Sequence, residues 1–403
     1  MKVLEGNITA PKGFLASAIG VDLKGSGKEK EDIMVVYSEV PAKAAGTFTK
    51  NLVKSGTVTY CMENIKNENA RAFLGLSGVA NTAVKDALEK ADMMCSLAAD
   101  FLNIDKSEVL PACTGRIGKI VDIERIKSGF DKMKAPDKNS SDAVSRAIMT
   151  TDSFPKKITV QEEIGGSTVT ISCIGKGSGM IHPNMGTTIN FATTDIAISK
   201  ELLQEALSSA IDETFNMLSI DGDMSTNDTF LIMTSGLAGN EEIVSKNEDY
   251  ELFKNALTEA TRVIAKLIAS DGEGASKLLI SKIEGARTRE DARILAKSVI
   301  TSPRYKAAVN KFDDYAARIL ANMGYSGGMF DYLKATISYR WGEYDKVMYD
   351  RGESYGLSDE EKQSMLDIEE LIIFVDLHEG EFSSEAYGCD LGCEYINGLV
   401  EYK

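Results

Sequence analysis

The amino-acid sequence predicts an α/β fold in which mixed sheets are layered with helices. Strand-like and helix-like stretches alternate along the chain, which is typical of α/β proteins. Two of the expected strands form a hairpin, so the fold is not a simple doubly wound parallel sheet. The chain has 403 residues, of which 43% are apolar, so it can bury a substantial core. This length indicates one large domain or two to three packed ones.

The first half of the chain contains three readable elements. Residues 33–37 form a short apolar run that is typical of a strand. Residues 84–102 are expected to form an amphipathic helix, because six apolar side chains share one face. These are Val84, Leu88, Ala91, Cys95, Ala98 and Leu102. Residues 157–174 alternate between apolar and polar around Gly165-Gly166, which predicts a β-hairpin.

The second half of the chain continues the alternation. Apolar residues at helical spacing predict helices over residues 200–217 and 251–269. A strand is expected over residues 278–283, followed by a helix over residues 288–300 that begins at Thr288 as its N-cap.

Residues 369–376 and 384–390 are expected to be a closing pair of strands. The main domain should span about residues 1–285. A smaller C-terminal α/β domain should span about residues 286–403.

Charge excludes several classes of partner. Lys and Arg number 45 and Asp and Glu 61, so the net charge is −16. A surface this acidic repels phosphate backbones and anionic lipids, so neither nucleic acid nor a membrane surface is expected as a partner. The N-terminus lacks a secretory signal pattern, and no apolar run approaches the roughly 20 residues that span a bilayer. A cytoplasmic location is therefore expected.

Histidine and cysteine limit the chemistry. The only histidines are His182 and His378, which excludes a His-rich zinc site and leaves two candidates for the base of a Ser-His-Asp or Cys-His site. The six cysteines form no C-x-x-C pair, so we expect them to be buried small hydrophobic residues rather than disulfides or metal ligands. No metal and no cofactor is expected.

Two glycine-rich segments, residues 20–28 and 175–180, match neither the P-loop nor the dinucleotide-binding pattern. The first lies among charged residues before a strand and is expected to be a solvated turn. The second follows a strand, which leaves a backbone-lined anion cradle open as an alternative.

A Gly-Thr bond at Gly186-Thr187 follows a Pro-Asn turn. A hydroxyl residue after glycine can attack the preceding carbonyl, because glycine has no Cβ to block strained geometry. Hydrolysis of the resulting ester would leave Thr187 as a new N-terminus. Its α-amine, with a pKa of about 8, could then act as base for its own hydroxyl, without histidine. An arbitrary Gly-Thr pair is more often a loop threonine that caps a helix or a turn.

Ten short motifs match those of a known family, in the same order along the chain. They lie at residues 8–14, 45–49, 114–118, 148–155, 176–180, 183–187, 221–228, 271–275, 324–327 and 387–390. With these motifs the chain resembles the ornithine acetyltransferase / glutamate N-acetyltransferase (ArgJ-like) family of arginine biosynthesis.

The resemblance implies the DmpA/ArgJ-like architecture of self-cleaving N-terminal-nucleophile enzymes. It implies a precursor cut before Thr187 into an alpha fragment, residues 1–186, and a beta fragment, residues 187–403, assembled as a heterotetramer of two alpha and two beta fragments. It further implies that Thr187 takes an acetyl group from N-acetylornithine and passes it to the amine of glutamate. Some members of the family also accept acetyl-CoA.

The resemblance also assigns roles to individual residues. The hydroxyl of Thr114 and the backbone N–H of Gly115 match the family's oxyanion hole. Thr151, Lys176 and Glu273 match its substrate-binding positions. Each residue type has a structural alternative: Lys176 as a surface charge, Thr151 as a strand or cap residue, and Glu273 as a solvated acid.

Several segments depart from the family pattern, and the C-terminus departs most. Leu399 stands where the family has Asn, and the family's final hydroxyl residue would lie beyond Lys403. Residues 313–318 keep only the Asp and Arg ends of their motif, and Cys113 stands where Ser is common. Loss of polar contacts in a polar site changes specificity strongly, so the acyl-transfer core is expected to be retained in a divergent paralogue with an altered amino-acid pocket.

Three hypotheses follow. The first is a self-processing N-acetyltransferase that uses Thr187. The second is an aminopeptidase or amidase built on the same threonine, in which water resolves the acyl-enzyme. The third is a non-enzymatic relative that binds a small amino acid. His182, five residues before Thr187, is expected to be a turn residue.

Overall fold

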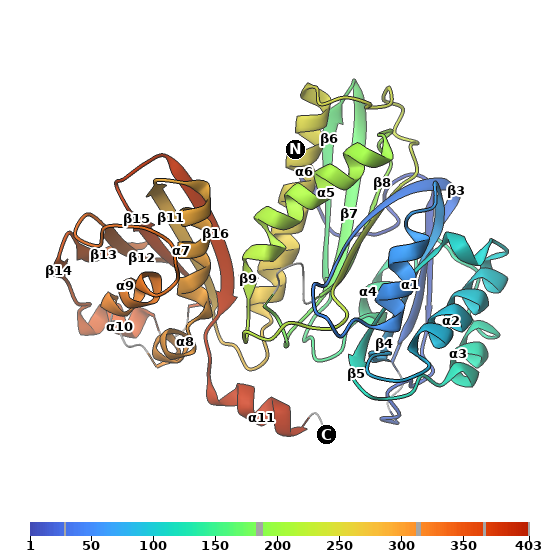
Figure 1. Ribbon diagram of the computed structural model, residues 1–403, viewed down its shortest axis with the longest axis horizontal. Helices are drawn as coiled ribbons and strands as arrows, with labels where there is room; N and C mark the ends of the chain where they lie inside the picture. Colours follow the sequence, from blue (N-terminus) through green and yellow to red (C-terminus); the bar gives the residue numbers. More distant parts are fainter. Residues whose placement is uncertain (28–29, 183–187, 312–315, 366–367, 402–403) are drawn as a thin grey trace. The chain divides into compact units, whose positions relative to one another are not determined.

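The computed structural model describes residues 1–27, 30–182, 188–311, 316–365 and 368–401, except for the side chains of residues 399–401 (Figure 1). The described chain divides into two compact units. The larger unit comprises Met1–Gly177, Pro183–Phe215 and Met224–Ile264. The smaller unit comprises Ser178–His182, Asn216–Asp223 and Ala265–Lys403. Each unit is built around its own sheet.

Within the described residues, nine strands form the sheet of the larger unit. Their order is β1-β6-β7-β8-β10-β3-β4-β5, with β2 paired to β3. The strands are β1 (Lys2–Leu4), β2 (Phe14–Ile19), β3 (Ile33–Phe48), β4 (Ala70–Val79), β5 (Val109–Arg116), β6 (Lys156–Ile164), β7 (Ser167–Lys176), β8 (Ile189–Thr194) and β10 (Thr229–Thr234). Strands β8 and β10 run parallel, whereas β3 is antiparallel to β10.

The long strand β3 belongs to both halves of this sheet. Its first part pairs with β2 and β4, and its last part pairs with β10. The register against β4 breaks between Tyr37 and Ala42, where the strand passes from one half to the other. Strands β4 and β5 therefore lie in one half-sheet, and β6, β7, β8 and β10 in the other.

The two half-sheets bury a common apolar core between their inner faces. Side chains of β3, β4 and β5 point into it from one side, and side chains of β7, β8 and β10 from the other. The rings of Phe73 and Phe191 meet across this layer, with centroids 5.1 Å apart. Strand β5 is thereby brought near β8, although the two strands are not neighbours in the sheet.

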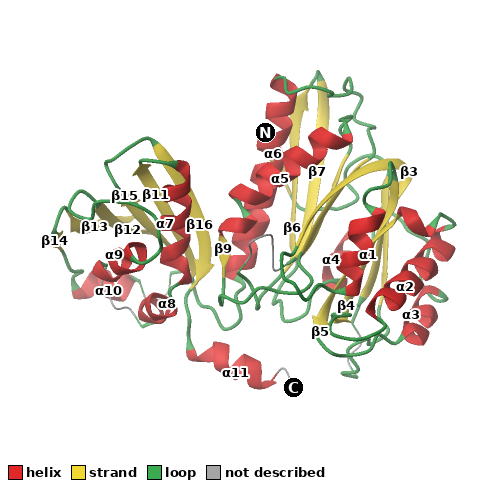
Figure 2. Cartoon of the chain, viewed as in Figure 1, coloured by secondary structure: helices red, strands yellow, loops and turns green. Residues whose placement is uncertain are grey.

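Helices flank the two half-sheets (Figure 2). The helices of the larger unit are α1 (Gly56–Asn64), α2 (Ala87–Leu102), α3 (Ile123–Phe130), α4 (Ser141–Ala147), α5 (Lys200–Glu213) and most of α6 (Glu248–Ser270). Helices α2 and α3 pack on the half-sheet that contains β4 and β5. Helix α5 packs on β3, and Ile264 of α6 lies against Gly175 of β7. The layers are thus helix, sheet, sheet and helix.

The smaller unit is a second sheet with helices, and its described strands have the order β14-β13-β12-β15-β11-β16-β9. The strands are β9 (Leu218–Ser219), β11 (Leu278–Ala286), β12 (Thr336–Trp341), β13 (Tyr344–Asp350), β14 (Glu353–Ser354), β15 (Glu370–Asp376) and β16 (Phe382–Cys389). Its helices are α7 (Arg289–Thr301), α8 (Pro303–Asn310), α9 (Ala317–Gly324), α10 (Asp359–Ser364) and α11 (Cys393–Glu401).

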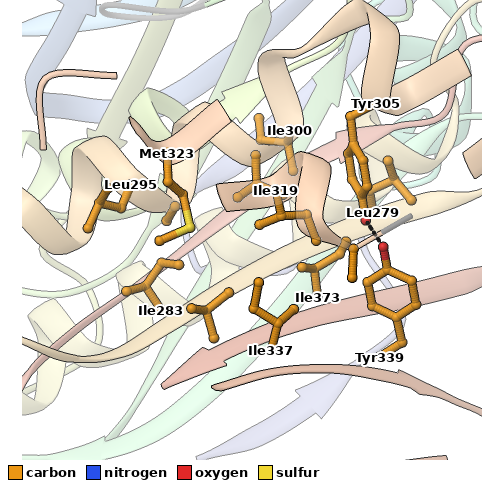
Figure 3. Close-up of a cluster of buried hydrophobic side chains, with 14 of the residues drawn as sticks. Leu279, Ile283, Leu295, Ile300, Tyr305, Ile319, Met323, Ile337, Tyr339 and Ile373 are labelled. Atoms are coloured by element: carbon orange, nitrogen blue, oxygen red, sulfur yellow. Dashed lines mark hydrogen bonds between the residues drawn. The ribbon is translucent and has the colours of Figure 1, made fainter. Parts of the chain in front are cut away.

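Helix α7 packs on β11 and β16, and its apolar face builds the core of the smaller unit. Figure 3 shows Leu295 and Ile300 of α7 beside Ile319 and Met323 of α9, above strand residues such as Ile337. At the end of this cluster the hydroxyl of Tyr305 donates to that of Tyr339 over 3.1 Å (Figure 3). The two buried polar atoms thereby satisfy each other.

The structure confirms the fold class predicted from the sequence: α/β, with mixed sheets layered with helices. The hairpin forms as β6 and β7 around Gly165-Gly166, and the Thr288 side chain accepts a hydrogen bond from Asp291 N at the start of α7. The helix expected from residue 84 begins at Ala87, and the helix expected to end at residue 217 ends at Glu213.

Two expectations need correction. The last two strands, β15 and β16, do not pair with each other, because β11 lies between them. Cys393 at the start of α11 is exposed, whereas the other five cysteines are buried as expected. Within the described residues, no helix is long and apolar enough to cross a membrane.

Candidate functional site

A buried carboxylate, Asp152, pairs with the candidate substrate lysine. Asp152 follows α4, and Lys176 is the last residue of β7. The Nζ atom of Lys176 lies 3.8 Å from Asp152 Oδ2, and that of Lys156 lies 2.7 Å from Oδ1. The backbone N–H groups of Thr150 and Gly177 donate to the same carboxylate over 2.9 and 2.7 Å. Three hydrogen-bond donors and one further ammonium group therefore surround the Asp152 carboxylate.

Neighbouring positive charges determine the pKa of Asp152. Although burial alone would raise the pKa of Asp152, the ammonium groups of Lys176 and Lys156 hold it well below the usual range of an aspartate. Two ammonium groups thus share one carboxylate. Thr151, the neighbour of Asp152, is partly exposed.

Thr114 and Gly115 lie at the carboxyl end of β5, opposite Ser77 and Gly78 of β4. Gly115 has a φ of 133°, which side chains rarely adopt. A Cβ at this position would overlap the backbone of Gly78. Glycine is therefore required here by both conformation and close approach. Thr114 and Gly115 are partly exposed, so their donors can be reached by a ligand.

Behind these two residues lies the buried thiol of Cys113. Its Sγ lies within hydrogen-bond distance of Thr57 Oγ1, at 3.0 Å, and of the Ala80 carbonyl oxygen, at 3.1 Å. Burial raises the pKa of Cys113 to about 11, and the hydrogen bonds of Thr57 and Ser55 offset only part of this. The thiol is therefore protonated near neutral pH, which argues against it as a rival nucleophile.

Thr188 lies directly before β8 and is buried. Its carbonyl accepts from Thr229 N over 2.9 Å, and its hydroxyl accepts from Asn190 Nδ2. Asp228, on the neighbouring strand end, is 1% exposed, and neither carboxylate oxygen makes a hydrogen bond of good geometry with the described residues. Burial raises the pKa of Asp228 well above that of an exposed aspartate.

The proposed cleavage residues Gly186 and Thr187 lie outside the described residues. Glu273 belongs to the smaller unit, where its N–H donates to Ser178 O over 2.8 Å and its carboxylate lies against Gly179. The structure therefore groups Thr151 with Lys176 around Asp152, and describes Glu273 separately in its own unit.

A sequence model of the ArgJ family matches residues 15–403. The chain belongs to the ArgJ family. It is 42% identical to the arginine biosynthesis bifunctional protein ArgJ 1 of Clostridium acetobutylicum, over 100% of this chain and 99% of that relative. It is 40% identical to the corresponding ArgJ protein of Symbiobacterium thermophilum and 40% identical to the glutamate N-acetyltransferase of Methanocaldococcus jannaschii, in both cases over 100% of each chain.

The ArgJ-family match confirms the resemblance seen in the sequence and the expectation of an acyltransferase enzyme. Sequence reasoning assigned no role to two further residues of the smaller unit, Asp221 and Tyr395. Asp221 of the smaller unit accepts from the N–H groups of Met180 and Ile181. Burial, with the charges of Asp221 and Glu273, raises the pKa of Tyr395 to about 12. Asp221 lies within a matched motif, which was a usable signal.

Proposed function

We propose that this protein is a self-processing N-acetyltransferase of arginine biosynthesis. It transfers an acetyl group from N-acetylornithine to the amine of glutamate through an acyl ester on Thr187. The observation that carries the proposal is the end-to-end match to the ArgJ family, from residue 15 to the last residue. Three residues at strand ends support it. Thr114 and Gly115, the expected oxyanion donors, are partly exposed, and Lys176, the expected substrate lysine, is buried.

Self-cleavage generates the nucleophile. The Thr187 hydroxyl attacks the Gly186 carbonyl, the C–N bond breaks, and the resulting ester is hydrolysed. Residues 1–186 then form the alpha fragment and residues 187–403 the beta fragment. The freed α-amine of Thr187, with a pKa of about 8, accepts the proton of its own hydroxyl in the next step.

Acetyl transfer then proceeds in two halves. The Thr187 oxygen attacks the acetyl carbonyl of the donor, and the amine of ornithine leaves with the proton held by the α-amine. The amine of glutamate attacks the ester in the second half and restores the hydroxyl. Both tetrahedral states carry a negative oxygen, which the Thr114 hydroxyl and the Gly115 N–H stabilise.

The cluster around Asp152 binds the α-carboxylate that donor and acceptor share. Lys176 is 7% exposed, so its ammonium is largely removed from water, and an ion pair formed there is screened little. Lys156 lies closer to Asp152 than Lys176 does, with Nζ–O distances of 2.7 and 3.8 Å. Thr151 adds a hydroxyl beside Asp152, and Glu273 accepts the substrate's ammonium group.

Assembly and location form part of the same proposal. Two alpha and two beta fragments associate as a heterotetramer in the cytoplasm. Leu399 stands where the family has Asn, so one polar side chain is missing from the C-terminal segment that the resemblance assigns to the amino-acid pocket. Asn397 lies two residues away on α11, where its side chain is exposed and donates to Glu394 over 3.1 Å.

Intact-mass analysis before and after addition of N-acetylornithine tests the proposal. Two fragments divided at the Gly186–Thr187 bond are expected, with one acetyl group on the fragment that begins at Thr187. Thr187→Ala should remain one chain. Uncut wild-type protein with full activity would refute the mechanism. Acetate release without an acceptor would favour the amidase hypothesis, and no adduct with several donors would favour the non-enzymatic one.

A further inference from the structure

Asn227 is the centre of a buried hydrogen-bond network in the larger unit. It lies two residues before β10 and is 4% exposed. Its Nδ2 donates to the carbonyls of Ala80 and Cys113 over 2.7 and 2.8 Å. Its Oδ1 accepts from the hydroxyls of Thr82 and Thr226 over 3.0 and 2.6 Å. The side chain therefore uses both of its donor hydrogens and both acceptor positions.

This network joins three strand ends. Ala80 directly follows β4, Cys113 is within β5, and Asn227 precedes β10. Strands β4 and β5 belong to one half-sheet, and β10 pairs with β8 in the other. Asn227 is thus a direct polar link between the half-sheet that carries Thr114 and the half-sheet whose strand β8 begins just after Thr188.

The link acts on one particular peptide group. The Cys113 carbonyl that accepts from Asn227 belongs to the peptide bond between Cys113 and Thr114. A peptide unit is planar, so holding its carbonyl also fixes the orientation of the chain entering Thr114 and Gly115. The two carbonyls at Nδ2 can only accept, so an amide turned over would place Oδ1 against two acceptors, and this fixes the orientation of the amide.

We propose that Asn227 is a positioning residue for the oxyanion donors Thr114 and Gly115, an inference that rests on the proposed function. Its amide donates to the Cys113 carbonyl and so aims the following two donors at the developing negative oxygen. Oxyanion donors act only when they are held at the correct position before charge develops. Asn227 touches neither substrate nor reacting atom in this role.

Asn227→Asp is the decisive variant, because it keeps the size of the side chain but replaces the donating Nδ2 with an acceptor. Asn240→Asp is its matched control. Asn240 is 9% exposed in the same unit, lies beyond the other end of β10, and its Nδ2 also donates to two carbonyls, those of Ala197 and Glu241. Both changes place a carboxylate against two carbonyls, so their general structural cost should be similar.

The readout is kcat and KM for N-acetylornithine, per molecule of self-cleaved enzyme as counted by intact mass. For Asn227→Asp we expect kcat to fall by about 10- to 100-fold, since loss of a whole oxyanion donor costs about 100- to 1,000-fold. KM should change less than about threefold, because ground-state binding is untouched. The kcat of Asn240→Asp should stay within about twofold of wild type, although its thermal midpoint should shift by about as much as that of Asn227→Asp.

A second pair of variants covers the case in which Asn227→Asp does not fold. Thr82→Val removes a hydroxyl that fixes the amide, and Thr82→Ser retains it. We expect kcat of Thr82→Val to be several-fold below that of wild type and kcat of Thr82→Ser to be close to wild type. KM should be unchanged in both variants. If self-cleaved Asn227→Asp has the kcat of wild type, the inference is overturned and the proposed function is not. If Asn227→Asp does not fold, wild-type kcat in Thr82→Val has the same consequence. Absence of acetyl transfer in wild type and Asn240→Asp would overturn the proposed function together with the inference.

Discussion

The ammonium group of Lys156 lies 2.7 Å from Asp152 Oδ1, and neither side chain is exposed to solvent. Lys156 is the first residue of β6, whereas Lys176, the other ammonium group beside Asp152, is the last residue of β7. The two lysines thus hold one carboxylate from the paired ends of a hairpin. Removal of either lysine takes a positive charge away from the buried Asp152 carboxylate, which water does not solvate.

Lys156→Met should destabilise the protein by about 3–5 kcal/mol, because it leaves a buried carboxylate with one partner fewer. Lys157→Met is the control. Lys157 is partly exposed and pairs with Asp142 on the surface, so its loss should cost about 1 kcal/mol or less. Urea unfolding of both variants measures the difference. Equal stability of the two would contradict a structural role for the buried pair.

Gly115→Ala should lower kcat by at least about 100-fold, because the added Cβ overlaps Gly78 and displaces an oxyanion donor. Gly118→Ala separates this clash from backbone strain. Gly118 also has a positive φ, of 77°, but a Cβ there meets nothing within 4 Å. That control should lose about 1 kcal/mol of stability and keep its activity. Steady-state acetyl transfer and thermal unfolding report both effects.

Two of the buried carboxyls of the larger unit, those of Asp228 and Asp152, should respond to pH in opposite directions. The pKa of Asp228 is raised, so the stability that this residue contributes is complete below the unfolded pKa of about 3.9 and is lost as pH rises. The free energy of unfolding of Asp228→Asn, relative to that of wild type, should therefore rise by about 1–3 kcal/mol as pH rises from about 4 to 7. The measurement is urea unfolding of the uncleaved Thr187→Ala chain across this range.

Asp152→Asn, also made in the uncleaved Thr187→Ala chain, should show the opposite dependence of stability on pH. Because the pKa of Asp152 is lowered, the stability from this residue is complete above about pH 3.9 and is lost as pH falls further. The variant should be less stable than its parent at neutral pH, and the gap should narrow below about pH 4. Parallel pH profiles for the two variants would refute the assigned charges.

Cys113 should resist alkylation in the native protein, because its thiol is buried and burial raises its pKa to about 11. Cys393 is exposed and should be labelled by iodoacetamide under the same conditions. Peptide mapping by mass spectrometry distinguishes the two. Cys113→Ser should retain acetyl transfer within about tenfold, whereas loss of all activity together with labelling of Cys113 would support a cysteine nucleophile.

Periodic elements of this fold were predictable from sequence, because each depends on a local pattern. The hairpin around Gly165-Gly166 and the cap at Thr288 are examples. Helix α2 begins at Ala87 rather than residue 84, since the apolar spacing extends into a turn that the pattern alone does not exclude. Cys393 shows the same limit, because nothing in its local sequence reveals that α11 leaves it exposed.

Residues that act through distant partners were less predictable. Asn227 lies inside a matched motif, but its partners Ala80 and Cys113 come from strands more than 100 residues away. Lys156 is the first residue of a strand, and a lysine at such a position is normally exposed to solvent. Its burial here depends on where Asp152 lies. Pairing across a fold leaves no periodic signal in the chain.

The strand order of the larger unit determines what a cut before Thr187 would leave behind. Strands β8 and β10 of the beta fragment lie between β7 and β3 of the alpha fragment, and are hydrogen-bonded to both. The products are interleaved polypeptides that share one sheet, so neither can depart without two ladders opening. Once unfolded, the mature enzyme must reassemble from separate molecules, and its renaturation should depend on protein concentration where that of the uncut chain does not.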